Sequence, residues 1–227
     1  MRRLIASSFL AVVLLVLALL VAVQSVAYDG DYIARELFKL KSPQVLGMNE
    51  GDVYRYAKQT AGYLRGALTD PNVKVTLKGE ELWFLNEREV LHMQDVRHLF
   101  LLARGAVTLL LLALLLLGLI AYRRTRLREY FQALSRGAVG GIAIAIFLAL
   151  LVSTDFNRYF TQFHLVSFTN DLWLLNPATD RLINLLPERF FANAAGQTAL
   201  RAMGMLLLLS LGGYLAARKK NNRQNLL

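Results

Sequence analysis

The stretch Gly105–Tyr122, GAVTLLLLALLLLGLIAY, is 18 residues long and carries no charged side chain. A helix needs roughly 20 apolar residues to cross the hydrocarbon of a bilayer. Three more uncharged stretches of similar length occur along the chain, at Leu4–Tyr28, Gly137–Thr154 and Ala202–Ala217. The sequence therefore predicts an all-α polytopic membrane protein, a bundle of four transmembrane helices. It excludes a simple soluble domain, and also an outer-membrane barrel, whose strands are short and alternating.

The overall composition agrees with a membrane protein. Apolar residues make up 56% of the 227-residue chain, charged residues 19%, and the mean hydropathy is +0.40. The chain contains no cysteine. Disulfides, thiol nucleophiles, iron–sulfur clusters and cysteine zinc sites are therefore excluded.

The net charge of +10 is unevenly distributed along the chain. Eleven basic residues and one acid lie in three short segments: the N-terminus, residues 123–136 and the tail from Arg218. The two long connections carry nearly balanced charge. Short basic flanks face the cytoplasm in bacterial membrane proteins. We therefore expect a protein of the bacterial cytoplasmic membrane with both termini in the cytoplasm. We interpret the basic residues as topology signals rather than a nucleic-acid surface.

The first apolar stretch has two interpretations. This stretch resembles a secretory signal, because a long apolar run follows the basic pair Arg2-Arg3. The small residues of a cleavage site would be Ser25-Val26-Ala27. The run is longer than the apolar region of a usual signal peptide, and that length favours an uncleaved anchor.

These observations divide the chain into eight segments, with a small extracytoplasmic subdomain of helix and β-hairpin in the first outer loop. The expected spans are 1–28, 100–122, 137–154 and 198–217. The expected outer loops are 29–99 and 155–197. The expected cytoplasmic parts are the basic loop 123–136 and the tail 218–227.

Several local patterns predict structure in the outer loops. Asn49 is typical of a helix N-cap, and alternation from Val73 to Leu77 is typical of a strand that turns at Lys78–Glu80 and returns through Leu82–Leu85. Such a hairpin is marginal alone and must pack on something. Asn86 and Glu89 have capping-box spacing, so a helix should run from Glu87 directly into the second span.

The second outer loop is rich in aromatic residues. The segment 155–168 is typical of a helix, and residues 182–186 of a short interfacial helix. In the third span, small residues recur at four-residue spacing, at Gly137, Gly141, Ala145 and Ala149. We expect another helix to approach this face closely.

The chain has three histidines: His92, His98 and His164. His92 and His98 are six residues apart and point to different sides of a helix, so they cannot chelate one metal as an i, i+4 pair does. His92 and His164 come from separate helices and can meet at the outer leaflet, where Asp95 could fix the tautomer of His92. Chemistry alone leaves two alternatives, an acid–base pair or two interfacial polar groups.

Two blocks of sequence resemble the bacterial lipoprotein intramolecular transacylase family. The first runs from Leu85 to Val96, LNEREVLHMQDV. The second begins at Phe163-His164 and continues through Phe168, Asn170, Trp173-Leu174, Asn176-Pro177 and Leu182-Ile183. The chain length and the four apolar stretches match as well.

The resemblance implies a reaction and a site. Members of this family move the sn-2 acyl chain of a diacylglyceryl-cysteine lipoprotein onto the α-amino group of that cysteine, which yields a lyso-form lipoprotein. The family's two essential histidines correspond to His92 and His164. The expected partners are a diacylated lipoprotein and membrane lipids, and we expect no cofactor and no metal.

Further residues around the two histidines are candidates for supporting roles. Candidates for orienting groups or oxyanion donors are Arg88, Glu89, Asp95, Arg158 and Asn170. Candidates for substrate contact are Phe163, Phe168 and Trp173. Two rival interpretations stay open at this point: a non-catalytic membrane adaptor that binds a partner through its outer loops, and a metal-dependent hydrolase that uses both histidines and a carboxylate.

Overall fold

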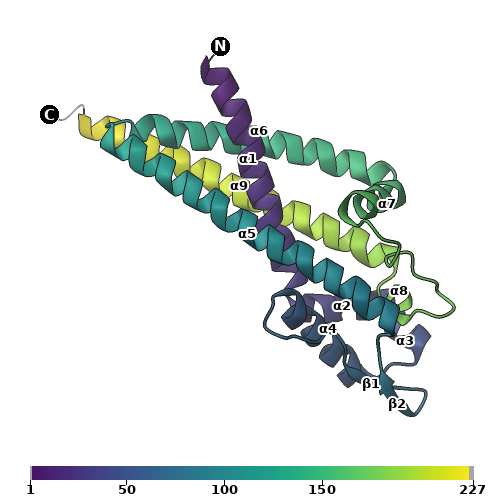
Figure 1. Ribbon diagram of the computed structural model, residues 1–227. Coiled ribbons are helices and arrows are strands. Elements are labelled where there is room, and N and C mark those ends of the chain that lie inside the picture. The colour runs from purple at the N-terminus through teal and green to yellow at the C-terminus, as the bar shows by residue number, and fades with distance from the viewer. Residues whose placement is uncertain (1, 225–227) are drawn as a thin grey trace. The chain divides into compact units, whose positions relative to one another are not determined.

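The structure is a computed structural model that describes the backbone of residues 2–224 and the side chains of residues 8–219 (Figure 1). The described helices are α1 (Arg2–Ala27), α2 (Gly30–Leu40), α3 (Ser42–Leu46), α4 (Glu50–Leu64), α5 (Glu87–Arg123), α6 (Leu127–Thr154), α7 (Phe156–Ser167), α8 (Arg181–Leu185) and α9 (Glu188–Gln224). The described strands are β1 (Lys74–Leu77) and β2 (Glu80–Trp83), which pair antiparallel.

Four of these helices, α1, α5, α6 and α9, are long and apolar enough to cross a membrane. The predicted fold class, an all-α polytopic membrane protein with a small hairpin, is confirmed. The chain forms two compact units. We call residues 23–103 and 154–197 the loop unit, and the remainder, which holds most of the apolar helix length, the membrane unit.

Close helix packing in the membrane unit depends on small residues of α6. A methyl group added to Gly137 would lie 3.1 Å from the Leu10 side chain of α1, and one added to Gly141 would lie 3.3 Å from the Ala11 carbonyl oxygen. On α9, the corresponding distance from Gly213 to the Phe131 carbonyl oxygen is 2.8 Å. The close approach predicted for Gly137 and Gly141 is confirmed.

The basic segment 123–136 is mostly helical, which differs from the loop that we predicted. Only Arg124–Arg126 separate α5 from α6. Arg, Leu, Gln, Glu and Ala are strong helix formers, and an ion pair between Arg126 and Glu129 supports the first turn of α6. We predicted a loop from the basic charge of the segment, whereas the helix propensity of its residues favours a helix. In the same way α9 begins at Glu188, ten residues before the expected span.

Two helices of the loop unit, α2 and α3, were not predicted. The Asp29 side chain accepts a hydrogen bond from the Tyr32 N–H at 2.9 Å and caps α2. The buried face of α2 carries Ile33, Ala34 and Leu37, which join the core of the loop unit. This face has helical spacing, and the sequence analysis did not test for it.

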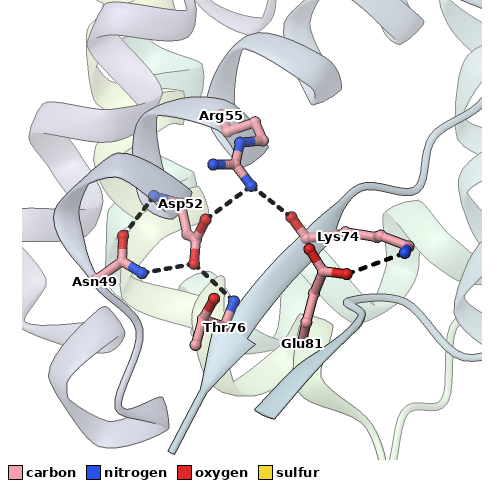
Figure 2. Close-up of polar contacts among 6 residues, drawn as sticks. All are labelled: Asn49, Asp52, Arg55, Lys74, Thr76 and Glu81. Carbon is pink, nitrogen blue, oxygen red and sulfur yellow. Dashed lines mark hydrogen bonds and ion pairs between the residues drawn. The ribbon is translucent and has the colours of Figure 1, made fainter. Parts of the chain in front are cut away.

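The helix α4 and the hairpin lie where the sequence predicts them, and one buried carboxylate joins them. Asn49 caps α4 by accepting the N–H of Asp52 at 2.9 Å. Figure 2 shows that the Asp52 carboxylate also reaches β1, where it accepts the N–H of Thr76 at 2.7 Å, and that it pairs with Arg55 at 3.0 Å. The hairpin is thus anchored to α4, which supplies the support that an isolated two-stranded hairpin lacks.

The start of α5 is the capping box that the sequence predicts. The Asn86 N–H donates to Glu89 Oε2 at 2.7 Å, and the Glu89 N–H donates to Asn86 Oδ1 at 2.9 Å. From there α5 runs without interruption for 37 residues, about 55 Å of helix against about 30 Å of hydrocarbon. The charged first part, Glu87–Leu99, therefore extends beyond the span.

Candidate active site

Two histidines from separate helices meet inside the loop unit. The ring centroids of His92 (α5) and His164 (α7) lie 6.3 Å apart, with an angle of 30° between the ring planes. Both residues are buried, with 7% and 9% of their surface exposed. His98 is exposed on α5. Of the three histidines in the chain, only these two form a pair.

The tautomer of His164 follows from one hydrogen bond. Asp155 caps α7, and the His164 Nδ1 atom lies 2.7 Å from the carbonyl oxygen of Phe160 in the preceding turn. A carbonyl oxygen can only accept, so Nδ1 carries the proton when the ring is neutral. The Nε2 atom then has a lone pair, which makes His164 a competent base.

His92 lies in the part of α5 outside the span and has a different environment. Burial is the main cause that lowers the pKa of His92 to about 4; electrostatic interaction with His164 and Arg88 acts in the same direction, and Asp95 opposes them. Its Nδ1 atom is buried and has no hydrogen-bond partner. His92 is therefore neutral at neutral pH, and its other ring edge is the one that can reach a substrate.

Aromatic rings surround the histidine pair. The Phe160 ring lies 4.4 Å from the His164 ring and the Trp173 ring 4.9 Å from it. Phe168 is buried against both histidines, 5.4 Å from His92 and 5.6 Å from His164. Phe163 contacts His164 at 5.4 Å and is half exposed. All three predicted aromatic contact residues therefore lie beside the pair.

A cavity of about 250 Å³ opens onto both histidines. Its apolar wall includes Phe160, Trp173, Leu175, Leu182, Leu186 and Phe191. Its polar lining consists of His92, His164, Thr161, Asn157 and Glu188. An apolar cavity that ends on two titratable groups suits a lipid-linked substrate that exchanges a proton.

Glu89, a candidate for an orienting or oxyanion role, has its contacts with backbone groups of the loop unit. Its side chain is fully buried and accepts hydrogen bonds from the backbone N–H groups of Asn86 and Leu182. Burial raises the pKa of Glu89, and those donors oppose the change. The carboxylate joins α5 to α8, and these contacts fit the supporting role among those predicted for Glu89.

Asp180 completes this connection between α5 and α8. It accepts the Asn86 side-chain amide at 2.8 Å and the Asn176 N–H at 2.7 Å. Burial alone would raise the pKa of Asp180, but hydrogen bonds from Asn176, Asn86 and Thr179 hold it below its usual range. The ionised Asp180 therefore fixes the turn at Asn176 against the start of α5.

Arg88, Asp95 and Asn170 hold the loop that carries Trp173. The Arg88 guanidinium donates to the Asp171 carbonyl oxygen, and the Asn170 side chain donates to Asp95 Oδ2 at 2.9 Å. The prediction that Asp95 fixes the tautomer of His92 is wrong at Nδ1, which has no partner. Arg88 and Asp95 influence His92 through their charges, and their contacts with Asp171 and Asn170 hold the loop that carries Trp173.

Of the predicted site residues, His92, His164 and Trp173 line the cavity, and Arg158 is one of those that do not. Its backbone N–H donates to Asp155 Oδ1 at 3.1 Å in the cap of α7, and its side chain is not part of the cavity lining. The sequence analysis missed Asn157, Thr161 and Glu188, which do line it. Asn157, Thr161 and His164 recur at helical spacing, and that signal could have found two of them.

The described part of the chain, residues 8–219, offers few side chains that could share a metal ion with the histidine pair. No group of three or more histidine or acidic side chains converges there as a ligand set. The two histidines therefore have no third protein ligand among the described residues.

Comparison with known proteins gives one family and one fold. The family model described as "Lipoprotein intramolecular transacylase Lit" matches residues 8–191. A solved structure of the membrane-integral lipoprotein intramolecular transacylase Lit from Bacillus cereus is 21% identical, with 98% of each chain covered and a TM-score of 0.76. A variant of that protein with one histidine replaced by arginine is 19% identical, covers 98% of this chain and 95% of its own, and also has a TM-score of 0.76. No curated protein sequence matches.

Proposed function

The chain belongs to the lipoprotein intramolecular transacylase family, and on that premise we propose that His92 and His164 are the catalytic pair that carries out its acyl transfer. The protein is a multi-pass membrane enzyme of lipoprotein maturation. The adaptor and metal-hydrolase interpretations have no support from this family. The observation that carries the catalytic assignment is the 6.3 Å separation of two buried imidazoles at the end of an apolar cavity.

His164 is the base in this proposal. The α-amino group of the lipidated cysteine has a pKa near 7.7–8.0, so much of it is protonated and cannot attack. The lone pair on His164 Nε2 accepts that proton. The free amine then attacks the carbonyl carbon of the sn-2 ester, forming a new C–N bond and a tetrahedral oxyanion.

His92 is the partner that stabilises this oxyanion. A neutral imidazole protonated on Nε2 donates a hydrogen bond to the developing negative charge, and a buried site makes such a donor more effective. The low pKa of His92 keeps it neutral at neutral pH, so the positive charge in the pair falls on His164.

The tetrahedral intermediate then collapses. The proton that His164 first accepted from the ammonium passes to water, and His164 then takes the second proton from the attacking nitrogen. As the bond between the carbonyl carbon and the glycerol oxygen breaks, the His164 imidazolium gives that second proton to the glycerol oxygen. The products are an amide at the cysteine nitrogen and a free sn-2 hydroxyl, the lyso form. Since nucleophile and ester belong to one molecule, the enzyme's main task is to hold them in a near-attack geometry.

The location of the reaction belongs to the same proposal. Both termini and the segment 123–136 are cytoplasmic, and the segments 29–99 and 155–197 carry the active site at the outer leaflet. Exposed apolar side chains near the site, Phe163, Leu165, Val166 and Leu174, support contact with lipid. The substrate is a diacylated lipoprotein, and the spans follow the eight segments given above.

The test is acyl transfer on a purified diacylated lipoprotein, with mass spectrometry to locate the acyl chain on nitrogen or on glycerol. Wild-type enzyme converts ester to amide. His92→Ala and His164→Ala should each lose about 10²–10⁴-fold in rate, the usual contribution of general acid–base catalysis. Normal conversion by both variants would refute the assignment.

A further inference from the structure

The cavity has one end that the proposed chemistry does not use. The two histidines at its inner end are buried, whereas Asn157 and Glu188, which also line it, are exposed. Asn157 Nδ2 donates to Glu188 Oε2 at 2.6 Å, so these two side chains form one polar group. The cavity therefore runs from the buried imidazoles to a polar, exposed mouth.

Among the residues whose side chains the structure describes, Glu188 is the one acidic group that lines this cavity, and no lysine or arginine lines it. The Asn157 amide holds one of its oxygens and leaves a negative charge at the mouth. A carboxylate in this position attracts a cation. The substrate's own α-ammonium is one candidate, and the geometry argues against it.

Asn157 and His164 are seven residues apart on α7, which is about 10 Å along the helix axis. The α-amine must be at the histidines when it reacts, so the carboxylate at the mouth is too distant to hold it. An extended peptide advances about 3.3 Å per residue, and 10 Å therefore corresponds to about three residues. The group that reaches Glu188 belongs to the second to fourth residue of the lipoprotein.

We infer that Asn157 and Glu188 form a subsite for a basic side chain near the N-terminus of the lipoprotein substrate. This inference rests on the proposed function, because the histidines fix where the lipidated cysteine lies. The peptide leaves the cavity through the polar mouth into water, and the subsite selects substrates by charge.

The experiment measures binding, so that it does not depend on turnover. The probes are lipopeptides with ether-linked chains, which cannot transfer an acyl group, carrying Lys, Gln or Glu at the third residue. Purified wild-type enzyme should bind the Lys peptide about two- to fivefold more tightly than the Gln peptide and the Glu peptide more weakly, the size expected of an exposed ion pair. Higher salt should reduce the difference.

Variants of the enzyme test whether the preference for the Lys peptide depends on Glu188. Glu188→Gln should abolish the preference, and Glu188→Lys should reverse it. Glu80→Gln, which removes an exposed carboxylate on β2 away from the cavity, should keep it. Equal binding of all three peptides by wild type, or a preference that survives in Glu188→Gln, would overturn the inference. The proposed catalytic function is tested separately: failure of the wild-type enzyme to transfer the acyl chain of an ester-linked lipopeptide would contradict the catalytic pair, not the subsite.

Discussion

His164 Nδ1 and the Phe160 carbonyl oxygen lie 2.7 Å apart within one turn of α7. The contact is local, because residues i and i+4 of a helix are neighbours. It fixes the proton on the buried side of the ring and directs the lone pair to the cavity. His92 has no equivalent contact at Nδ1, so the two imidazoles differ in their hydrogen bonding although they lie side by side.

The first prediction concerns the pair as a unit. If His92 and His164 serve one acyl migration, the double alanine variant should be little slower than the slower single variant, because groups that act together are not additive. His98→Ala is the matched control and should keep most of the rate, since His98 is exposed on the same helix. If the rate of the double variant fell by the product of the two single-variant factors, the two histidines would act independently and the prediction would be wrong.

The second prediction follows from the depressed pKa of His92. The folded state keeps His92 neutral down to about pH 4, whereas the unfolded chain binds its proton near pH 6.5. Above pH 6.5 neither state binds this proton, so His92 does not lower the free energy of unfolding. As the pH falls from 6.5 toward 4 only the unfolded chain binds the proton, so the free energy of unfolding decreases. We expect the melting temperature in detergent to fall over this range in wild type.

The variant that checks this prediction is His92→Gln, which cannot titrate. It should show a smaller decline of melting temperature between pH 6.5 and pH 4 than wild type. His98→Gln, at an exposed position, should decline as wild type does. An unchanged decline in His92→Gln would show that other groups cause the acid sensitivity.

The sequence alone predicted the features that depend on composition and short-range pattern. Uncharged runs gave the four long helices, and the Asn49 and Asn86 caps gave the starts of α4 and α5. These features are local, since each depends on residues within one or two turns. Chemistry alone gave the histidine pair as one of two alternatives, and the family resemblance favoured it. It stayed an expectation, because spacing along the chain does not fix a distance between helices.

What the sequence did not predict depends on tertiary contacts. Glu89 was expected near the chemistry, and its carboxylate instead binds the N–H of Leu182, 93 residues away. Glu188 was not identified, because nothing near it in sequence shows that α9 begins there beside α7. Charge was a poor guide to helix boundaries, as the helical segment after Arg126 shows.

The third prediction concerns topology. Since the chain has no native cysteine, single exposed cysteines report accessibility without background. Lys41→Cys and Thr169→Cys should react with an impermeant thiol reagent in intact cells. Arg124→Cys, between α5 and α6, should react only after the membrane is opened. Labelling of Arg124→Cys in intact cells would reject the proposed orientation.

The fourth prediction compares two carboxylates near the hairpin. Asp52→Ala leaves the Thr76 N–H and the Arg55 guanidinium without their partner, and we expect a loss of about 1–3 kcal/mol in stability. Glu81→Ala removes an exposed ion pair with Lys74 and should cost less than about 1 kcal/mol. Equal melting temperatures of the two variants would show that Asp52 does not anchor the hairpin (Figure 2).

The last prediction separates support of the site from catalysis. Glu89→Ala removes the acceptor for the buried N–H of Leu182 and for the partly buried N–H of Asn86; a buried donor left unpaired costs about 1–3 kcal/mol. Because Leu182 lines the cavity, loosening it should weaken substrate binding as well as stability. We therefore expect a lower melting temperature and a raised KM in the acyl-transfer assay, with a smaller change in kcat than His164→Ala causes. Glu89→Gln keeps one carbonyl acceptor and should recover part of the stability. A variant of Glu89 that melts like wild type and loses only kcat would instead place this carboxyl group in the chemistry.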